Sequence, residues 1–150
     1  MSDATTDLVI TRIFDAPRAL VYRAFTDPDQ FSAWFGPVGW SVPRDSVDIE
    51  PKVGGHQRFT MVSDEDATQS SPVDATFVEV VENELLVGEQ DTSAIPELGG
   101  AVMRMRVEFY DEPDGRTRLV VTQGPYQPEI IEMAREGWAS SFTKLDKLLA

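Results

Sequence analysis

The chain has 150 residues, 41% hydrophobic and 26% charged, which are ordinary values for one globular domain, so we predict a single domain over residues 1–150. Its 26 acidic and 13 basic residues give a net charge of −13, which argues against nucleic acid and anionic membranes, because phosphate binding needs clustered Lys and Arg. Cysteine is absent, which excludes disulfides and thiolate chemistry. Without a signal peptide or a long apolar run, we expect a cytoplasmic protein.

A strand and two helices are predicted first. Residues 8–14 alternate between polar and apolar side chains, as a strand does. Asp15 is expected to cap a helix that holds Pro17 in its first turn. The apolar stripe of this helix comprises Leu20, Val21, Ala24 and Phe25. Thr26-Asp27-Pro28 ends it, and a short second helix, closed by Gly36-Pro37, carries three aromatic residues on one side: Phe31, Trp34 and Phe35.

Six further strands are predicted as three antiparallel hairpins. They cover residues 47–51 and 57–62, joined at Gly54-Gly55, then 76–81 and 85–91, and then 102–111 and 116–123. Residues 82–84 and 112–115 supply the last two turns, and the polar stretch 63–72 is interpreted as a hairpin connection. One amphipathic helix is predicted over residues 128–149, because apolar residues recur there at helical spacing: Ile131, Ala134, Trp138, Phe142, Leu145 and Leu149.

This order of elements, β-α-α-β6-α, indicates an α+β fold. The long final helix and the bent antiparallel sheet each have one apolar side to bury. We therefore predict a curved sheet wrapped around the C-terminal helix, with an internal cavity between them.

Four stretches resemble a known superfamily. They are residues 13–40, Val53-Gly54-Gly55 followed by residues 58–61, then residues 117–122, and finally Glu136-Gly137-Trp138 with the leucines that follow. Together they resemble the SRPBCC or START-like superfamily, and more narrowly the family named after the C-terminal domain of the activator of the heat-shock protein 90 ATPase. The resemblance implies the helix-grip fold, with a cavity between sheet and helix. It leaves function open, because the superfamily includes lipid carriers, hormone receptors and enzymes. Because the sequence begins at the first predicted strand, we expect the chaperone-binding N-terminal domain of the founding activator to be absent.

Few residues indicate catalysis. His56 is the only histidine and is interpreted first as a strand-end residue, with a polar cavity-lining role and a catalytic role as alternatives. With 26 acidic residues, those within strands, Glu79 among them, are interpreted first as solvent-facing. The alternative is that Glu79 faces inward if Phe77 and Val81 do, since side chains alternate along a strand. No nucleophile motif, metal-binding motif or phosphate-binding loop is visible, so we predict no catalytic residue, no metal and no cofactor.

Alternation predicts an apolar sheet face opposite the helix. Met103 and Met105 share that face with Val107 and Phe109, and Met side chains adapt to irregular shapes. Core packing and an adaptable pocket wall are both compatible with this pattern. Gln123 continues the inward register of Leu119 and Val121 although it is polar, which favours a hydrogen-bonding anchor over acid–base chemistry.

Aromatic residues are expected near the mouth of the cavity and along the helix. Trp138 would need an acceptor for its N–H if buried. The full set of predicted ligand-binding residues is Trp34, Phe35, Trp40, His56, Phe59, Met61, Met103, Met105, Gln123, Tyr126, Trp138 and Phe142.

We interpret the protein as a non-catalytic binder of a small hydrophobic ligand, as a monomer or weak homodimer. The alternative is a protein-partner module that regulates a heat-shock chaperone ATPase in the stress response, with an acidic surface for a basic partner. The third hypothesis is an enzyme that acts on a hydrophobic substrate, with Glu79, His56 or Tyr126 as general acid or base.

Overall fold

The computed structural model describes residues 6–91 and 102–150, and the described strands form one eight-stranded sheet. Its strands are β1 Thr6–Phe14, β2 Trp40–Ser41, β3 Asp48–Ile49, β4 His56–Ser63, β5 Ser70–Val81, β6 Leu85–Asp91, β7 Val102–Glu112 and β8 Arg116–Tyr126. All pairs are antiparallel, in the order β1-β8-β7-β6-β5-β4-β2, and β3 also pairs with β4. The three α-helices described are α1 Arg18–Thr26, α2 Pro28–Trp34 and α3 Pro128–Leu149, and short 3-10 turns cover Arg44–Ser46 and Pro113–Gly115.

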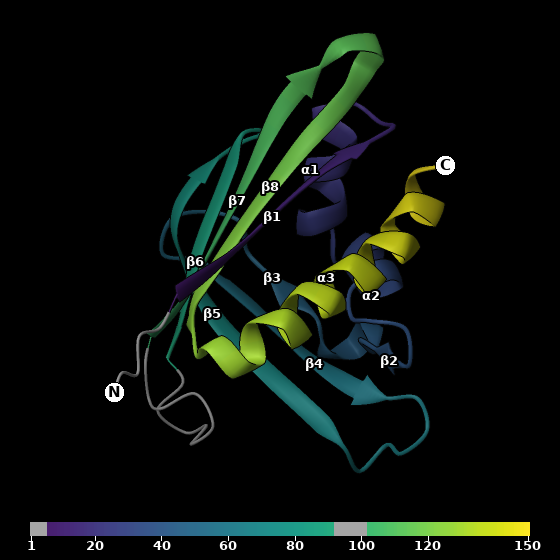
Figure 1. Cartoon of the computed structure of the whole chain (residues 1–150), viewed down its shortest axis with the longest axis vertical. Coiled ribbons are helices and arrows are strands. Elements are labelled where there is room, and N and C mark those ends of the chain that lie inside the picture. The colour runs from purple at the N-terminus through teal and green to yellow at the C-terminus, as the bar shows by residue number, and fades with distance from the viewer. Residues whose placement is uncertain (1–5, 92–101) are drawn as a thin grey trace.

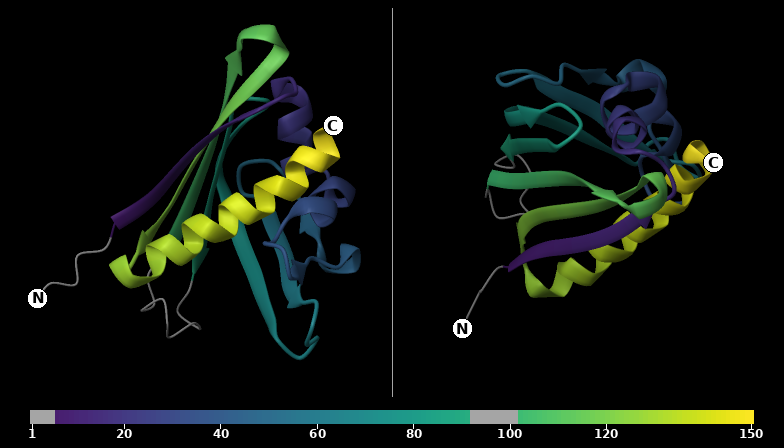
Figure 2. Two further views of the ribbon diagram at one scale, coloured as in Figure 1. Left: turned by 45° about the vertical axis from the view of Figure 1, so that its right-hand side comes forward. Right: turned by 90° about the horizontal axis from the view of Figure 1, so that it is seen from above.

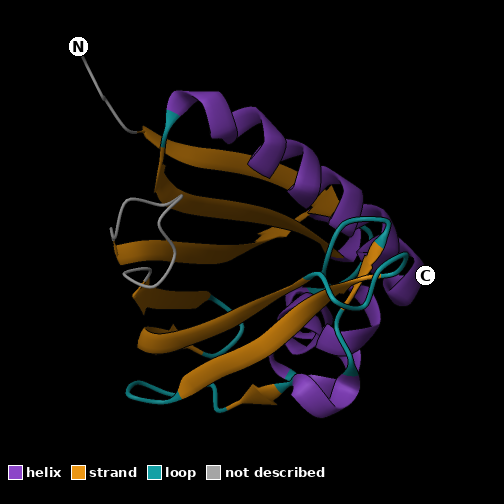
Figure 3. Ribbon diagram, turned by 90° about the horizontal axis from the view of Figure 1, so that it is seen from below, coloured by secondary structure: helices purple, strands orange, loops and turns teal. Residues whose placement is uncertain are grey.

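The sheet is curved, and the helices lie on its concave side (Figure 1). Figure 2 shows β1, β8 and β7 diverging from β4 and β5, with α3 running across the opening between them. Seen from below, the strands form a bent wall with the helices gathered along one side (Figure 3). This arrangement confirms the predicted α+β fold, in which a curved antiparallel sheet wraps a long C-terminal helix.

The first two helices begin differently from the prediction. Asp15 caps neither of them: α1 starts after Pro17, and no side chain caps it. The cap is Asp27, whose carboxylate accepts a hydrogen bond from the Asp29 N–H at 3.0 Å and so starts α2. Asp27 also ends α1, because its N–H donates to the carbonyl of Arg23. One residue thereby terminates one helix and begins the next, with Pro28 in the first turn of α2.

The buried face of α1 is rotated from the predicted stripe. Leu20 is 44% exposed, and Tyr22 is buried in its place, with its ring 5.4 Å from that of Phe109 on β7. The other three predicted positions, Val21, Ala24 and Phe25, are buried. Leu20 is exposed because the sheet covers only the side of α1 on which Tyr22 and Phe25 lie.

The strands match the predicted hairpins, although several bounds differ and β8 runs on to Tyr126. β3 has only two residues, the two-residue β2 was not predicted, and β5 begins at Ser70, so that the connection from β4 covers residues 64–69. Two turns contain a non-glycine residue with positive φ, Asn83 at 65° and Asp114 at 65°. Asn and Asp tolerate this left-handed conformation better than other side chains, so both turns suit their sequences.

A bulge in β5 changes which side chains face inward. Phe77 pairs with Gly88 and Glu79 pairs with Val87, so Val78 is an extra residue on this strand. Beyond the bulge the alternation shifts by one: Glu79 is exposed, Val80 packs against the core and Val81 is 41% exposed. The solvent-facing interpretation of Glu79 is therefore confirmed. The inward alternative is wrong, because the argument from alternation assumed an uninterrupted strand.

Aromatic rings fill the space between α2, α3 and the sheet. Trp34 is fully buried and lies 5.0 Å from Phe25 between ring centroids, while its indole N–H donates to the Ala24 carbonyl at 2.8 Å. Phe142 of α3 packs edge-on against Phe14 of β1, with centroids 5.2 Å apart. These contacts fix the C-terminal half of α3 against the sheet.

Polar contacts attach α3 to both edges of the sheet. Arg135 donates to the Val9 carbonyl of β1 at 3.1 Å, and Arg12 pairs with Asp146. On the opposite side, Lys144 donates to the Trp40 carbonyl of β2 at 3.1 Å. The bond from Arg135 satisfies a backbone carbonyl of the edge strand β1, and the bond from Lys144 does the same on the edge strand β2. Edge strands otherwise expose unpaired backbone groups.

Candidate ligand-binding cavities

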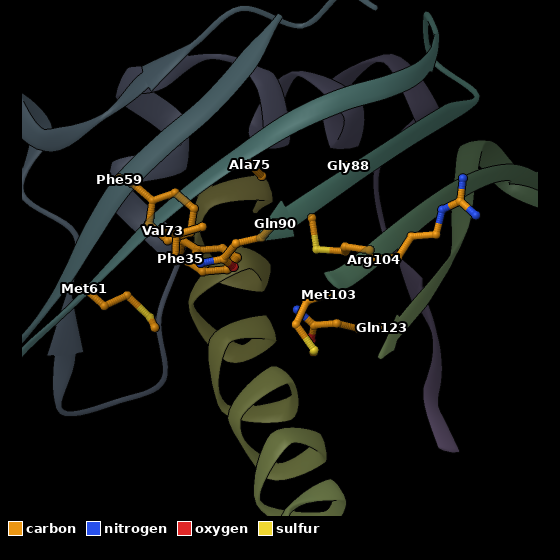
Figure 4. Close-up of a pocket in the computed structure, with 11 residues that line it drawn as sticks. Phe35, Phe59, Met61, Val73, Ala75, Gly88, Gln90, Met103, Arg104 and Gln123 are labelled. Carbon is orange, nitrogen blue, oxygen red and sulfur yellow. The ribbon is translucent and has the colours of Figure 1, made fainter. Parts of the chain in front are cut away.

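Two neighbouring cavities open on the inner side of the sheet, and α3 bounds the second of them. The first is about 130 Å³ and is enclosed mainly by strands β4 to β8 (Figure 4). Its walls include six of the predicted ligand-binding residues: Phe35, Phe59, Met61, Met103, Met105 and Gln123. The second is about 350 Å³ and lies between the end of β8, the Gly36-Pro37 turn and the N-terminal half of α3. It is also lined by Tyr126 and Trp138.

Three side chains belong to both walls. Phe35, Met61 and Gln123 line the first cavity and the second, and so stand between the two spaces. Phe35 follows α2, Met61 lies on β4 and Gln123 lies on β8. Two of these three side chains are apolar, so passage from one space to the other crosses a mostly apolar partition.

The polar feature of this partition is a hydrogen-bonded group around Gln123. Its Oε1 accepts from Tyr126 Oη at 2.8 Å and from Trp138 Nε1 at 2.8 Å. Trp138 was expected to need an acceptor for its N–H, and Gln123, a polar residue that the alternation placed on the inner face of β8, supplies it. Because Gln123 lies on β8 and Trp138 on α3, this bond joins the sheet to the helix at the cavity wall.

The phenol of Tyr126 is neutral near neutral pH. Burial raises the pKa of Tyr126 to about 12, because removal from water disfavours the phenolate. Its proton is engaged with Gln123. At neutral pH, Tyr126 therefore acts as a hydrogen-bonding group and is poorly suited to be a general base.

Charged groups stay at the edge of the first cavity. Arg104 contributes to its wall, but Figure 4 shows its guanidinium pointing away from the other labelled side chains. Its Nε lies 3.5 Å from Glu89 Oε2, and its side chain is 61% exposed. The inner surface is thus left to apolar side chains and two amides, those of Gln90 and Gln123.

Four predicted site residues line neither cavity. Trp34 and Phe142 belong to the packed core, because both are almost completely buried among other rings. Trp40 lies on the short edge strand β2, where its carbonyl accepts from Lys144. His56 begins β4, with its Nε2 2.9 Å from Asp48 Oδ1 in a geometry that does not form a hydrogen bond.

Several wall residues were not predicted. Val73 and Ala75 lie on the first half of β5, whose Ser, Pro and Asp residues resembled a loop. Alternation of Val73, Ala75 and Phe77 was the signal that could have identified them. Small residues form much of the rest, including Gly88 of β6 and Ala134 and Gly137 of α3. Small side chains on two facing elements leave space, and this pattern is visible in sequence only once the elements are paired.

Two further properties concern the residues that the structure describes. Over residues 6–91 and 102–150, no three side chains of metal-ligating type lie close enough together to hold an ion. None of the helices described is both long and apolar enough to cross a membrane.

A family described as "Activator of Hsp90 ATPase homolog 1-like protein" matches residues 15–150. The chain belongs to this family. The match confirms the resemblance seen in the sequence. No curated protein matches the chain.

Several solved structures share the fold. A protein of Nitrosomonas europaea is 26% identical with a TM-score of 0.79, and the match covers 99% of this chain and 96% of that one. A protein of Chromobacterium violaceum is 23% identical with a TM-score of 0.82, over 95% and 96% of the two chains. The AHSA1 protein of Silicibacter pomeroyi is 24% identical with a TM-score of 0.76, over 96% and 97%. The last two, being below 25% identity, show the fold alone.

Proposed function

We propose that this protein binds a small, mostly apolar molecule in the paired cavities between the sheet and α3. The observation that carries the proposal is the space itself: about 350 Å³ beside about 130 Å³, separated by only three shared side chains. Another hollow among the described residues reaches about 500 Å³, but charged side chains such as Lys52 and Glu82 line it, so the mostly apolar lining distinguishes the paired cavities more than their size does. Ligand pockets of drug-sized molecules typically span about 300–1,000 Å³.

The chemistry of the walls supports an apolar ligand. Met103 and Met105 face the first cavity, Met133 faces the second, and Met61 faces both. Unbranched, polarizable Met side chains adapt to ligands of different shape. A few polar groups, above all Gln123, would orient the polar end of the molecule. Non-catalytic binding is the activity that this combination favours.

The four methionines also supply the test. We would label the Met methyl groups with ¹³C and record NMR spectra during titration with small aromatic compounds, fatty acids and polyketides. Binding should shift Met103 and Met105 for a ligand in the first cavity and Met133 for one in the second. Met61 should shift in both cases, because it lines both walls. No shift of any of the four with any compound class would contradict the proposal.

Regulation of a heat-shock chaperone is the second candidate. It is supported by the description of the family and by the net charge of −13, which would attract a basic surface. The test is to measure the ATPase rate of Hsp90 with and without this protein, together with binding at low and moderate salt. Stimulation that weakens as salt increases would support it, because salt screens contacts between exposed charges. Unchanged ATPase rates and no binding at either salt concentration would contradict it.

A further inference from the structure

We infer that the Gln123 side chain presents its amide N–H groups to the ligand, and that the ligand therefore carries an uncharged acceptor oxygen, such as a ketone or ester carbonyl, on an otherwise apolar body. The inference deepens the proposed function and rests on it. It specifies which kind of polar end the paired cavities accept.

The orientation of the amide follows from its partners. Trp138 Nε1 lies 2.8 Å from the Gln123 amide group, and an indole N–H can only donate. The atom facing it must therefore be the carbonyl oxygen, because the NH₂ group has no acceptor to offer. The Tyr126 hydroxyl donates to the same oxygen at 2.8 Å. With two donors on Oε1, turning the amide over would lose both bonds.

The NH₂ group is consequently left for the cavity. None of the described residues accepts a hydrogen bond from Gln123 Nε2, nor is this nitrogen among the fully buried polar atoms without a partner. Gln123 lines both cavities, so its free amide group reaches the space where they meet. A donor in an apolar surrounding favours a ligand that supplies an acceptor.

The other polar wall residues do not require the ligand to be a hydrogen-bond acceptor. Gln90 in the first cavity and Ser141 in the second can each donate or accept. Tyr126 has committed its proton to Gln123, so its oxygen is left to accept. Among the described wall residues, Gln123 is thus the uncharged side chain that can only donate a hydrogen bond to the ligand.

The same walls disfavour a carboxylate. Arg104 is the cationic residue of the first wall, and it points outward near Glu89 (Figure 4). The second cavity has no Lys or Arg among its described wall residues. A buried anion needs a paired charge or several hydrogen bonds, and one amide supplies less than that. A neutral carbonyl needs only the donor that Gln123 offers.

The experiment compares acetophenone with ethylbenzene, which has a methylene group in place of the carbonyl. Affinities are measured for the wild type and for Gln123→Glu, whose carboxylate still accepts from Trp138 and Tyr126 but has no donor. For each protein we take the ratio of the acetophenone affinity to the ethylbenzene affinity. Comparing this ratio between wild type and variant cancels the difference in hydration between the two ligands. We expect the preference for acetophenone to fall by about fivefold or more in the variant, the value of one lost neutral hydrogen bond. Measurements at about pH 8 keep the new carboxyl group ionised even if burial raises its pKa.

Two further measurements make the assignment specific. Gln127→Glu adds the same charge at the start of α3, outside both walls, and should leave the ratio unchanged. In the wild type, the ¹⁵N-labelled side-chain amide of Gln123 should shift on adding acetophenone and much less on adding ethylbenzene. Equal loss of preference in both variants, or equal shifts with both probes, would overturn the inference while leaving ligand binding intact. Failure of both probes to bind would contradict the proposed function, and the inference with it.

Discussion

The rings of Phe35 and Trp138 stand perpendicular to one another, with centroids 5.6 Å apart. Phe35 also stacks on Phe31 at 4.5 Å and meets Phe59 edge-on at 5.0 Å. The ring that separates the two cavities is therefore part of the aromatic packing that holds α2, β4 and α3 together. A substitution of Phe35 should therefore change both the space available to a ligand and the stability of the fold.

Phe35→Ala should destabilise the protein and merge the cavities. We expect a loss of about 2–4 kcal/mol in the free energy of unfolding, somewhat below the range for a fully buried Phe because Phe35 is partly exposed. Urea denaturation measures this loss, and a series of aromatic ligands of increasing size measures the space. Phe35→Leu is the control. It should lose less free energy of unfolding and should accept ligands only slightly larger than the wild type does. A variant that tolerates no larger ligand than the wild type would contradict the role of Phe35 as partition.

The bond between Gln123 and Trp138 should make a measurable contribution to stability. Gln123→Met keeps the length of the side chain but leaves the Trp138 N–H without its acceptor, at a cost of about 1–3 kcal/mol. In a Trp138→Phe background no N–H is left unpaired, so the same change should cost about 1 kcal/mol less. The four unfolding free energies form a double-mutant cycle. A coupling energy near zero would show that this bond does not link β8 to α3.

Sequence periodicity predicted the sheet, the long helix and the inward position of Gln123, because each depends on local alternation or helical spacing. Where the chain departs from regular geometry, local alternation gives the wrong facing of side chains. The bulge at Val78 moved Glu79 outward, and no feature of residues 76–81 identifies it. Trp34 and Phe142 are large aromatic residues of the kind that line pockets, but both lie in the core. Whether such a residue lines a cavity or fills the core depends on how the three helices pack together. The cavity itself arises from small residues on different elements, which become neighbours only in the folded chain.

Asp27, and not Asp15, should contribute capping energy. Asp27→Ala removes the acceptor of the Asp29 N–H at the start of α2, which should cost about 1 kcal/mol. Asp15→Ala serves as the matched control and should change stability by less than about 0.5 kcal/mol, since Asp15 is exposed and caps no helix. Thermal or urea unfolding of the two variants decides between the positions. Equal losses in both would contradict the assignment of the cap.

Gly137 should tolerate a side chain that fills the second cavity. A Cβ atom built at this position meets no other atom within 4 Å, and Gly137 lies within α3 on the cavity wall. Gly137→Ala should therefore stabilise the protein by about 0.4–1 kcal/mol, the usual gain when a helical glycine becomes alanine. Gly137→Leu should displace ligand signals at Met133 while leaving those at Met103. Gly55→Ala is the contrasting variant and should destabilise, because its Cβ would overlap the Glu50 carbonyl oxygen.

Stability should fall in strongly alkaline solution as Tyr126 ionises. The pKa of Tyr126 is about 12 in the folded protein against 10.0 ordinarily, with burial as the cause, so the folded state holds its proton more tightly than the unfolded state. The corresponding stabilisation is fully present below pH 10 and is lost as the pH rises through about 12, amounting to roughly 2–3 kcal/mol. Tyr126→Phe cannot ionise, so its free energy of unfolding should decline less over this range than that of the wild type. The comparison with Tyr126→Phe is needed because the pKa values of Tyr22 and Tyr110 are also raised, by burial and by a hydrogen bond to Glu108 respectively. Parallel decline in both proteins would show that the Tyr126 phenol is not protected by the cavity wall.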